Sequence, residues 1–317
     1  MEVFRWPDGP PPPIADSAVT LGVFDGVHVG HQEIIRQVVE SAARLGLRSA
    51  VITFDRHPEQ VLDGPPQPCI TSLAHRLHLF EQLGVKVCLV VGFTPDVAEM
   101  EAEDFARTVL RDVMGVRLFI VGFDCRFGKA RRGDVDLLRR MGRELRLEAR
   151  VVEPVKVGGE VVSSTAIRSA VSAGDLPRAK RLLGRPFSLL GTVVHGHGRG
   201  HSLGFSTANL DVHHELRPRE GVYAGWMLDE EWRRAAAVVS VGRQETFEQN
   251  ADAPVEVEVH VLDESPLLYE RDVEVQFVRW LRTQERFDSA DALIARIKTD
   301  IAQARRALTG GGLQDGC

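Results

Sequence analysis

The hydrophobic positions in the first half of the chain alternate between short continuous runs and longer stretches with helical spacing. Short apolar runs bounded by turn residues predict buried strands, and apolar residues three and four apart predict amphipathic helices. The pattern predicts strands at 19–24, 49–54, 85–92, 117–122 and 148–152, and helices between them at 32–45, 73–83, 102–114 and 134–144. Strands that alternate with helices are typical of an α/β fold with a parallel sheet covered on both faces.

The pattern changes in the second half to short strand-like segments separated by glycine, proline and charged turns. Two helices, at 164–173 and 176–183, come first and are closed by Gly184 and Pro186. The later segments predict a small antiparallel barrel or sandwich, followed by an amphipathic helix at 290–308. Its strands are predicted at 189–194, 221–228, 235–241, 255–262 and 273–278. We therefore predict two domains, 1–186 and 187–317.

Composition supports two folded domains and excludes several classes of protein. The chain has 317 residues, 44% of them hydrophobic, and a net charge of −6, which argues against an electrostatic nucleic-acid binder. Its four cysteines are scattered without a C-x-x-C pair, which fits a reducing cytoplasm. The N-terminus has no apolar signal region, and no run of 18 apolar residues could span a bilayer. We expect a cytoplasmic protein with small-molecule partners and no membrane partner; composition leaves the oligomeric state open.

The segment GVFDGVHVGH, residues 22–31, joins the first predicted strand to the first predicted helix. The strand is predicted to end at Val23–Phe24, and a tight Asp25–Gly26 turn leads into a helix that begins near His28. Free N–H groups and the positive end of a helix dipole bind phosphate at such a place. His28 and His31 share a helical face and can donate hydrogen bonds to phosphate oxygens. The alternative interpretation is a pair of solvated surface histidines.

Three further segments follow predicted strands or open a helix, where the ligand crevice of a parallel sheet forms. They are TFDRHPEQVL at 53–62, VGFDCRFGKARRGD at 121–134 and VSSTAIR at 162–168. Ser164 or Thr165 can cap a helix while presenting hydroxyl and N–H groups to phosphate, and Arg168 can supply positive charge. The alternatives are an ordinary helix cap at 164–165 and an ordinary turn at 122–128.

A second candidate site lies in GTVVHGHGRGHSLGFSTANL, residues 191–210. A strand leads into a glycine-rich loop at 195–200 that could fold over a nucleotide. Thr207 and Asn209 follow, and small oxygen ligands of this kind suit Mg²⁺ and phosphate better than zinc. Two alternatives are a flexible linker and a zinc site made by His195, His197 and His201, although no carboxylate or thiol lies beside them in the sequence.

These motifs, in this order and at these spacings, resemble the bacterial bifunctional riboflavin kinase/FAD synthetase family. The resemblance covers nearly the whole chain. It implies a Rossmann-like nucleotidyltransferase domain with a parallel sheet, followed by an antiparallel β-barrel riboflavin kinase domain with a C-terminal helix. It also implies two reactions, each using ATP and Mg²⁺: phosphorylation of riboflavin to FMN, and adenylylation of FMN to FAD with release of pyrophosphate. The segment 282–301 is similar to the C-terminal helix region of the family.

The resemblance also implies which residues form the two sites. In the adenylyltransferase, His28 and His31 would be catalytic, and ATP would be bound by Gly22, Phe24, His28, His31, Ser163, Ser164, Thr165 and Arg168. The flavin would lie near His57, Pro58, Asp124 and Phe127. In the kinase, ATP would be bound by Gly196, Gly198, Gly200, Gly204, Thr207 and Asn209, the last two also holding the metal.

Glu258 would be the kinase base toward the riboflavin 5′-hydroxyl, because an alcohol is a poor nucleophile until its proton is accepted. Strand alternation places Glu256, Glu258 and His260 on one face, and a solvated face is the alternative interpretation.

The kinase half departs from the family pattern at Ser206, where proline is usual, and in the segment 240–247, which includes Ser240 and Glu245 and stands where N-I-G-x-R-P-T-F is usual, so that the asparagine, arginine and proline are lost. These departures leave open a monofunctional FMN adenylyltransferase with a degenerate kinase domain. A flavin- or nucleotide-binding regulator without catalysis is a further alternative.

Overall fold

The computed structural model describes residues 1–7, 14–56, 67–194, 205, 207–212, 216–231, 233–243, 255–262 and 269–309. The chain divides into two compact units, Met1–Ser164 and Thr165–Cys317. The helices α7 (Ser164–Ala173) and α8 (Leu176–Leu183) therefore group with the second unit, and α8 contacts two of its strands, β9 and β14. The domain boundary near residue 186 stays a prediction.

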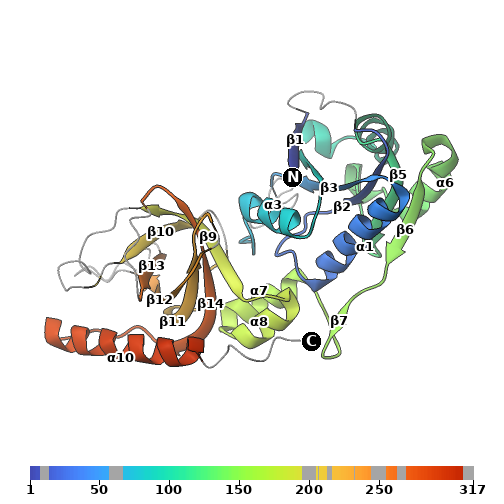
Figure 1. Ribbon diagram of the computed structural model, residues 1–317. Helices are drawn as coiled ribbons and strands as arrows, with labels where there is room; N and C mark the ends of the chain where they lie inside the picture. Colours follow the sequence, from blue (N-terminus) through green and yellow to red (C-terminus); the bar gives the residue numbers. More distant parts are fainter. Residues whose placement is uncertain are drawn as a thin grey trace. The chain divides into compact units, whose positions relative to one another are not determined.

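The first unit is built on a six-stranded sheet in which all pairs run parallel, as predicted. The strands lie in the order β1-β4-β3-β2-β5-β6 (Figure 1). Their bounds are β1 (Glu2–Trp6), β2 (Ser17–Leu21), β3 (Arg48–Phe54), β4 (Val87–Val91), β5 (Val116–Gly122) and β6 (Glu148–Val152). Strands β2 and β4 are buried at every position, because helices cover both faces.

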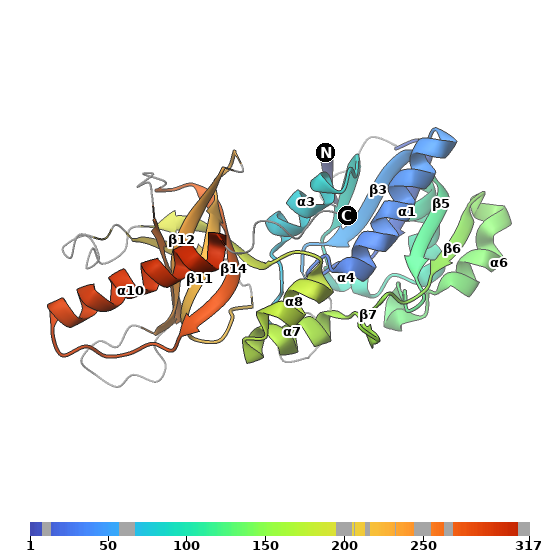
Figure 2. The same ribbon diagram turned by 60° about the horizontal axis from the view of Figure 1, so that its bottom comes forward.

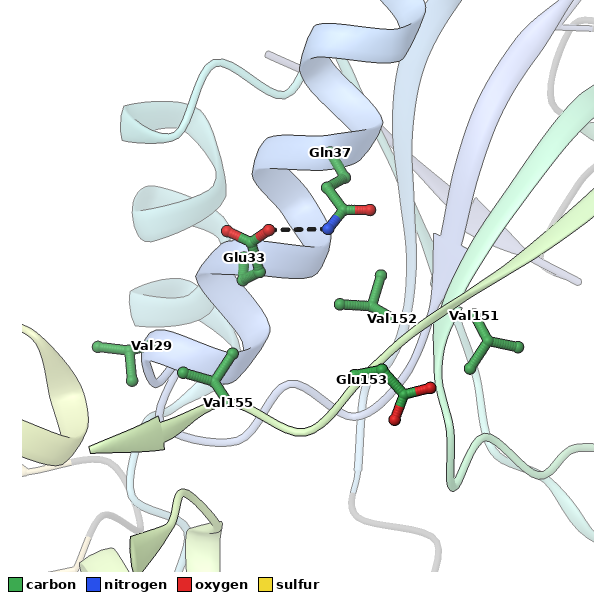
Figure 3. A pocket seen from close by; sticks show the side chains of 7 residues that line it. All are labelled: Val29, Glu33, Gln37, Val151, Val152, Glu153 and Val155. Atoms are coloured by element: carbon green, nitrogen blue, oxygen red, sulfur yellow. Dashed lines mark hydrogen bonds between the residues drawn. The ribbon is translucent and has the colours of Figure 1, made fainter. Parts of the chain in front are cut away.

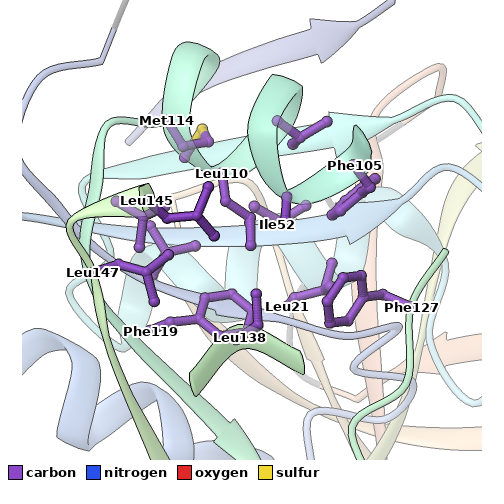
Figure 4. Close-up of a cluster of buried hydrophobic side chains, with 14 of the residues drawn as sticks. Leu21, Ile52, Phe105, Leu110, Met114, Phe119, Phe127, Leu138, Leu145 and Leu147 are labelled. Carbon is purple, nitrogen blue, oxygen red and sulfur yellow. The ribbon is translucent and has the colours of Figure 1, made fainter. Parts of the chain in front are cut away.

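The helices of the first unit divide between the two faces of this sheet (Figures 1 and 2). They are α1 (Val29–Leu45), α3 (Leu73–Gln82), α4 (Pro95–Ala98), α5 (Ala102–Phe105), the π-helix η1 (Ala106–Val113), the short 3₁₀ helix η2 (Lys129–Arg131) and α6 (Val135–Leu145). On one face, α1 and α3 bury Ile35, Val38 and Phe80 against the strands. On the other, α5, η1 and α6 enclose the largest core cluster, which includes Leu110, Phe119 and Leu138 (Figure 4).

The strand order places a topological switch point between β2 and β5. The chain leaves β2 through α1 toward β3, on one side, whereas β5 lies on the other side of β2. Ligands of open parallel sheets bind in the crevice beyond the carboxyl ends of the strands at such a point. The segments after β2 and after β5, which carry the predicted ATP and flavin residues, both begin there.

A two-stranded hairpin, β7 (Lys156–Val157) and β8 (Glu160–Val161), follows the sheet. Its turn residues Gly158 and Gly159 have φ values of +60° and +84°. Positive φ at both turn residues gives the backbone twist that a two-residue hairpin needs, and glycine adopts it without steric cost.

The second unit contains a closed six-stranded barrel in the order β10-β13-β12-β11-β14-β9, which decides between the barrel and the sandwich. Every pair is antiparallel. The strands are β9 (Phe187–Val194), β10 (Ala208–Val212), β11 (Gly221–Leu228), β12 (Arg234–Arg243), β13 (Val255–Val261) and β14 (Asp272–Arg282). The aromatic rings of Phe187, Tyr223 and Phe277 fill its interior.

The predicted C-terminal helix is α10 (Ala290–Thr309), which packs on β11, β12 and β14. Ala304 and Leu308 bury its apolar side, and Asp300 accepts hydrogen bonds from Arg282 at the end of β14. Within the described ranges, no helix is both long enough and apolar enough to cross a membrane.

Candidate active sites

The connection between β2 and α1 is longer than the sequence pattern predicts. Strand β2 ends at Leu21, before the predicted limit at Phe24, and within the connection Phe24 and Val27 adopt positive φ values of +54° and +40°. The Phe24 ring turns into the core and packs edge-on against Phe80. Left-handed backbone at bulky or β-branched residues is uncommon and persists only where the surroundings hold it.

The Asp25 carboxylate holds this turn to the chain before α3. It is 3% exposed and accepts hydrogen bonds from Ile70 N at 2.9 Å and Thr71 N at 3.1 Å. The hydroxyl of Thr71 accepts a bond from Gly26 N at 2.8 Å. Sequence reasoning treated Asp25 only as a turn residue, since its partners lie 45 residues away in the chain. The Asp25 carboxylate therefore fixes the turn between β2 and α1, where phosphate is predicted to bind.

The structure brings the two predicted histidines into direct contact. His28 is the N-cap of α1, and its Nδ1 accepts a hydrogen bond from His31 N at 3.2 Å. The two rings stack with their centroids 3.5 Å apart. A side chain at Gly30 would lie 3.3 Å from the His28 ring, so glycine leaves room for the stack. The pair stands at the N-terminus of a 17-residue helix, where backbone N–H groups and the helix dipole favour an anion.

The imidazole of His31 is held neutral in this arrangement. Burial lowers its pKa well below 6.5, and the neighbouring His28 and the positive charge of Arg76 lower it further. Its Nδ1 atom is buried and has no hydrogen-bond partner among the described residues. A negatively charged ligand could therefore bind here. Its charge would oppose the lowering of the His31 pKa by His28 and Arg76.

The predicted helix start at Ser164 lies beside the same turn. Ser164 Oγ donates a 3.0 Å hydrogen bond to the carbonyl oxygen of Asp25. The preceding residue, Ser163, is half-buried. Thr165 and Arg168 belong to the second compact unit, so their place in the nucleotide site stays a prediction.

The segment after β5 forms a closed loop that ends at a bridge between Phe127 and Gly133. Phe127 is 5% exposed and packs against Phe105 in the core, so its ring anchors the loop. Asp124 is exposed nearby, at the carboxyl end of the sheet. The predicted flavin residues His57 and Pro58 lie outside the described residues.

An open groove of about 730 Å³ includes in its lining Val29, the residue after His28. Figure 3 shows its lining: Val29, Glu33 and Gln37 from α1, and Val151, Val152, Glu153 and Val155 from β6 and the segment after it. On the wall formed by α1, Gln37 Nε2 donates a 2.7 Å hydrogen bond to Glu33 Oε1, one helical turn earlier. Sequence reasoning predicted none of these residues, because β6 and α1 are more than 100 residues apart in the chain.

The barrel aligns three polar side chains that are far apart in the sequence. Asn209 on β10 and Ser240 on β12 each lie directly opposite Glu258 on β13. Residues in register on neighbouring strands share a face of the sheet. The predicted kinase residues Asn209 and Glu258 are thus brought together, and Thr207 lies two residues before Asn209. The predicted loop residues Gly196, Gly198, Gly200 and Gly204, and the alternatives that rest on 195–201, lie outside the described residues.

The side-chain oxygen of Asn209 is available to a ligand. Asn209 Oδ1 is buried and has no hydrogen-bond partner within the described part of the chain. A buried acceptor without a donor is costly, and a bound cation or donor would remove that cost.

Gln284, which follows β14, was not predicted. Its Nε2 donates a 3.2 Å hydrogen bond to Ser240 Oγ, and its amide fills the space that a side chain at Gly242 would occupy. Ser240, one of the departures from the family pattern, is therefore hydrogen-bonded to the segment that follows β14.

Comparison with known proteins identifies both units. Residues 12–166 match the sequence profile described as FAD synthetase, and residues 183–308 match that described as riboflavin kinase. The bifunctional riboflavin kinase/FMN adenylyltransferase of Listeria monocytogenes is 34% identical, over 92% of this chain and 92% of its own. That of Escherichia coli strain K12 is also 34% identical, over 90% of this chain and 91% of its own.

A solved structure has the same fold along nearly the whole chain. The crystal structure titled "Macrolide-efflux Protein from Streptococcus pneumoniae" superposes with a TM-score of 0.82 at 30% identity, covering 96% of this chain and 99% of that one. The relatives and the two profile matches agree with the parallel sheet, the closed barrel and the motifs carried by each. This chain belongs to the bifunctional riboflavin kinase/FMN adenylyltransferase family.

Proposed function

We propose that the chain converts riboflavin to FAD in two ATP-dependent steps, with adenylyl transfer at the switch point of the sheet and phosphorylation on the barrel. The observation that carries the proposal is the stacked pair of His28 and His31 at the N-terminus of α1. Imidazoles, helix N–H groups and a closely tied turn at one place are suited to a triphosphate.

In the adenylyl transfer, an oxygen of the FMN phosphate forms a bond to the α-phosphorus of ATP. The bond from that phosphorus to the bridging oxygen breaks, and pyrophosphate leaves with the electron pair. The FMN phosphate is already a nucleophile at neutral pH, so no strong base is needed. His28 and His31 donate hydrogen bonds as charge develops on the phosphate oxygens, and Gly22, Phe24, Ser163, Ser164, Thr165 and Arg168 complete the proposed nucleotide site.

The flavin side of this site would be formed by the loop after β5 and the segment after β3. Asp124 and Phe127 belong to the first of these, and His57 and Pro58 to the second. Phe127 would contribute by anchoring the loop, because its ring is packed in the core.

In the kinase step, the riboflavin 5′-hydroxyl oxygen forms a bond to the γ-phosphorus of ATP, and ADP leaves. Glu258 accepts the hydroxyl proton. Thr207 and Asn209 are suited to hold Mg²⁺ with the ATP phosphates, since the buried Oδ1 of Asn209 has no donor among the residues that the structure describes. When bound, the ion neutralises charge on the phosphates.

The monofunctional alternative rests on departures that include Ser240. The register of Asn209, Glu258 and Ser240 favours an intact kinase site, because the proposed base and metal ligand face each other. A regulator without catalysis would have no use for this pairing together with the histidine stack.

Chromatography of flavins after incubation with ATP and Mg²⁺ tests the proposal. We expect FMN and FAD from riboflavin, and FAD from FMN. Glu258→Gln should stop product formation from riboflavin and leave FAD formation from FMN unchanged. Glu256→Gln, two residues earlier on the same strand face, is the matched control and should retain both activities. FAD from FMN but no product from riboflavin in the unaltered chain would establish the monofunctional alternative, and no FAD from FMN would refute the proposal.

We also propose that the enzyme works in the cytoplasm on these small molecules. Cys69, Cys88 and Cys125 are free thiols, which fits a reducing compartment. The net charge of −6 gives no electrostatic support for a nucleic-acid partner.

A further inference from the structure

Arg76 is a buried charged residue to which the reaction described above gives no role. It lies on α3, in the first unit, and is 4% exposed. Burial lowers its pKa, and the nearby carboxylate of Asp25 opposes that shift. Arginine is almost never fully buried without partners for its charge. The two terminal nitrogens of Arg76 have hydrogen-bond partners, whereas its Nε is buried and has none among the described residues.

The contacts of Arg76 join the ends of two neighbouring strands. Its Nη1 donates to Val23 O at 2.7 Å and to Thr53 Oγ1 at 2.8 Å, and its Nη2 donates to Phe54 O at 3.1 Å. Thr53 Oγ1 itself donates to Val23 O at 3.1 Å. Val23 opens the turn that leads to His28, whereas Thr53 and Phe54 end β3. The planar guanidinium therefore fixes the turn to the sheet.

This turn is the part of the candidate site that most needs support. Phe24 and Val27 hold positive φ, which residues of their type adopt only when the surroundings impose it. Two further hydrogen bonds hold the later part of this turn: Gly26 N donates to Thr71 Oγ1, and Gln32 Nε2 donates to Val27 O at 2.8 Å. Arg76 anchors its first residue.

We propose that Arg76 is a positioning residue for adenylyl transfer: it ties the turn after β2 to the end of β3 and so sets where the imidazoles of His28 and His31 stand. The inference rests on the proposed roles of these histidines. Arg76 touches no substrate in this scheme and acts through the turn. A small displacement of groups that stabilise a transition state lowers kcat strongly, whereas ground-state binding depends less on their placement.

The test compares Arg76→Met, which keeps the length of the side chain, with Arg76→Lys, which keeps its charge but not its fork of donors. We expect Arg76→Met to lower kcat for FAD formation from FMN by roughly 10- to 100-fold, with the KM values for ATP and FMN changed less than about threefold. Arg76→Lys should recover part of the loss. Riboflavin phosphorylation should be unchanged in both. Arg36→Met, an exposed arginine on α1, is the matched control and should leave FAD formation unaltered.

A double-mutant cycle separates action through the histidines from a general effect. In the His28→Asn background, Arg76→Met should lower the rate by a smaller factor than it does in the unaltered chain, because one of the two imidazoles that Arg76 positions is already absent. If His28→Asn alone leaves FAD formation intact, the proposed histidine role fails, and this result is distinct from any failure of the Arg76 inference.

Three results would overturn the inference. They are a wild-type kcat in folded Arg76→Met, a rise in KM for ATP with kcat retained, and full additivity with His28→Asn. Should Arg76→Met not fold, Arg76→Lys and Thr53→Val decide the question. Thr53→Val removes one partner of the guanidinium, and we expect a smaller loss of kcat with the same unchanged KM. Wild-type kcat in both of these variants would refute the inference.

Discussion

At the residue scale, His28 has two separable tasks, capping α1 and facing the ligand. Asparagine is an equally good N-cap, whereas alanine is not. We expect His28→Asn to lower FAD formation about 100- to 1,000-fold, which is the usual cost of losing a donor to transition-state charge. Its thermal midpoint should stay near that of the unaltered chain, and riboflavin phosphorylation should be retained.

His28→Ala provides the comparison for this prediction. It should lose the same activity and, in addition, about 1 kcal/mol of helix stability, because His31 N loses its cap acceptor. Equal FAD formation in the asparagine variant and the unaltered chain would show that His28 serves only as a cap.

The lowered pKa of His31 predicts how stability depends on pH. The pKa is near 6.5 in the unfolded chain and well below 6.5 in the folded chain. Between these values the unfolded chain binds more protons, so the contribution of His31 to the free energy of unfolding is largest above pH 6.5 and falls as the pH drops below it. The loss is at most about 1.4 kcal/mol per pH unit for one group.

Urea unfolding at about pH 7.5 and about pH 5.5 measures this pH dependence of stability, with His31→Asn as the comparison. The unaltered chain should lose more stability between the two pH values than the variant. The same pH dependence in both would mean that His31 is protonated as readily in the folded chain as in the unfolded chain.

The sequence could predict that His28 and His31 lie together at the start of a helix, because their type and spacing are local; their catalytic role stays a prediction. It could not predict Arg76 or Asp25, whose roles come from contacts with segments 22 to 53 residues away. Arg76 occupies an ordinary helical position in the sequence. The only available signal was an arginine on the apolar side of an amphipathic helix.

At the scale of elements, the loop between β5 and α6 depends on close packing at Gly133. A side chain there would lie 2.6 Å from the Phe127 ring and 2.7 Å from its carbonyl oxygen. Gly133→Ala should therefore push Phe127 out of the core, at a cost of about 1–3 kcal/mol, and lower FAD formation by misplacing Asp124. Thermal unfolding and the flavin assay measure the two effects.

Gly92→Ala is the matched control, because a side chain at Gly92 would meet its nearest neighbour at an ordinary 3.5 Å. Its stability and activity should be close to those of the unaltered chain. If Gly133→Ala were equally harmless, the loop would have more freedom than its packing indicates.

Most long elements followed from periodicity. Helices α7 and α8 begin and end where predicted, and the predicted strands of the sheet are present with ends shifted by a few residues. The single helix predicted at 102–114 is an α-helical turn that continues as a π-helix, a change of hydrogen bonding that apolar spacing does not encode. Strands β1 and β10 were not predicted, because neither contains a continuous apolar run: β1 has no buried position, and β10 has the sequence ANLDV.

At the scale of the whole molecule, the residues proposed to react with substrate at the two sites, His28 and Glu258, lie in different compact units, and FMN is the product of one proposed step and the substrate of the other. A mixture of His28→Asn and Glu258→Gln should therefore make FAD from riboflavin, although neither variant does so efficiently alone. FMN made by the first variant accumulates and then serves the second. We expect a lag in FAD formation that shortens as the concentration of the first variant rises.

Chromatography at timed intervals checks this complementation. A mixture of the unaltered chain with either variant provides the reference rate. Failure of the mixture, with each variant retaining its own single step, would mean that FMN must be delivered within one chain.

The way the sheets end has a consequence for the protein at high concentration. The described strands of the barrel form a closed order, so each strand has a neighbour on both sides and none is an edge strand. The parallel sheet does have two margins, β1 and β6, but these are short and expose charges: Glu2 and Arg5 on one, and the ion-paired Glu148 and Arg150 on the other. Charged margins of this kind discourage strand addition between molecules. The chain should therefore resist aggregation by intermolecular β-pairing as long as both units stay folded.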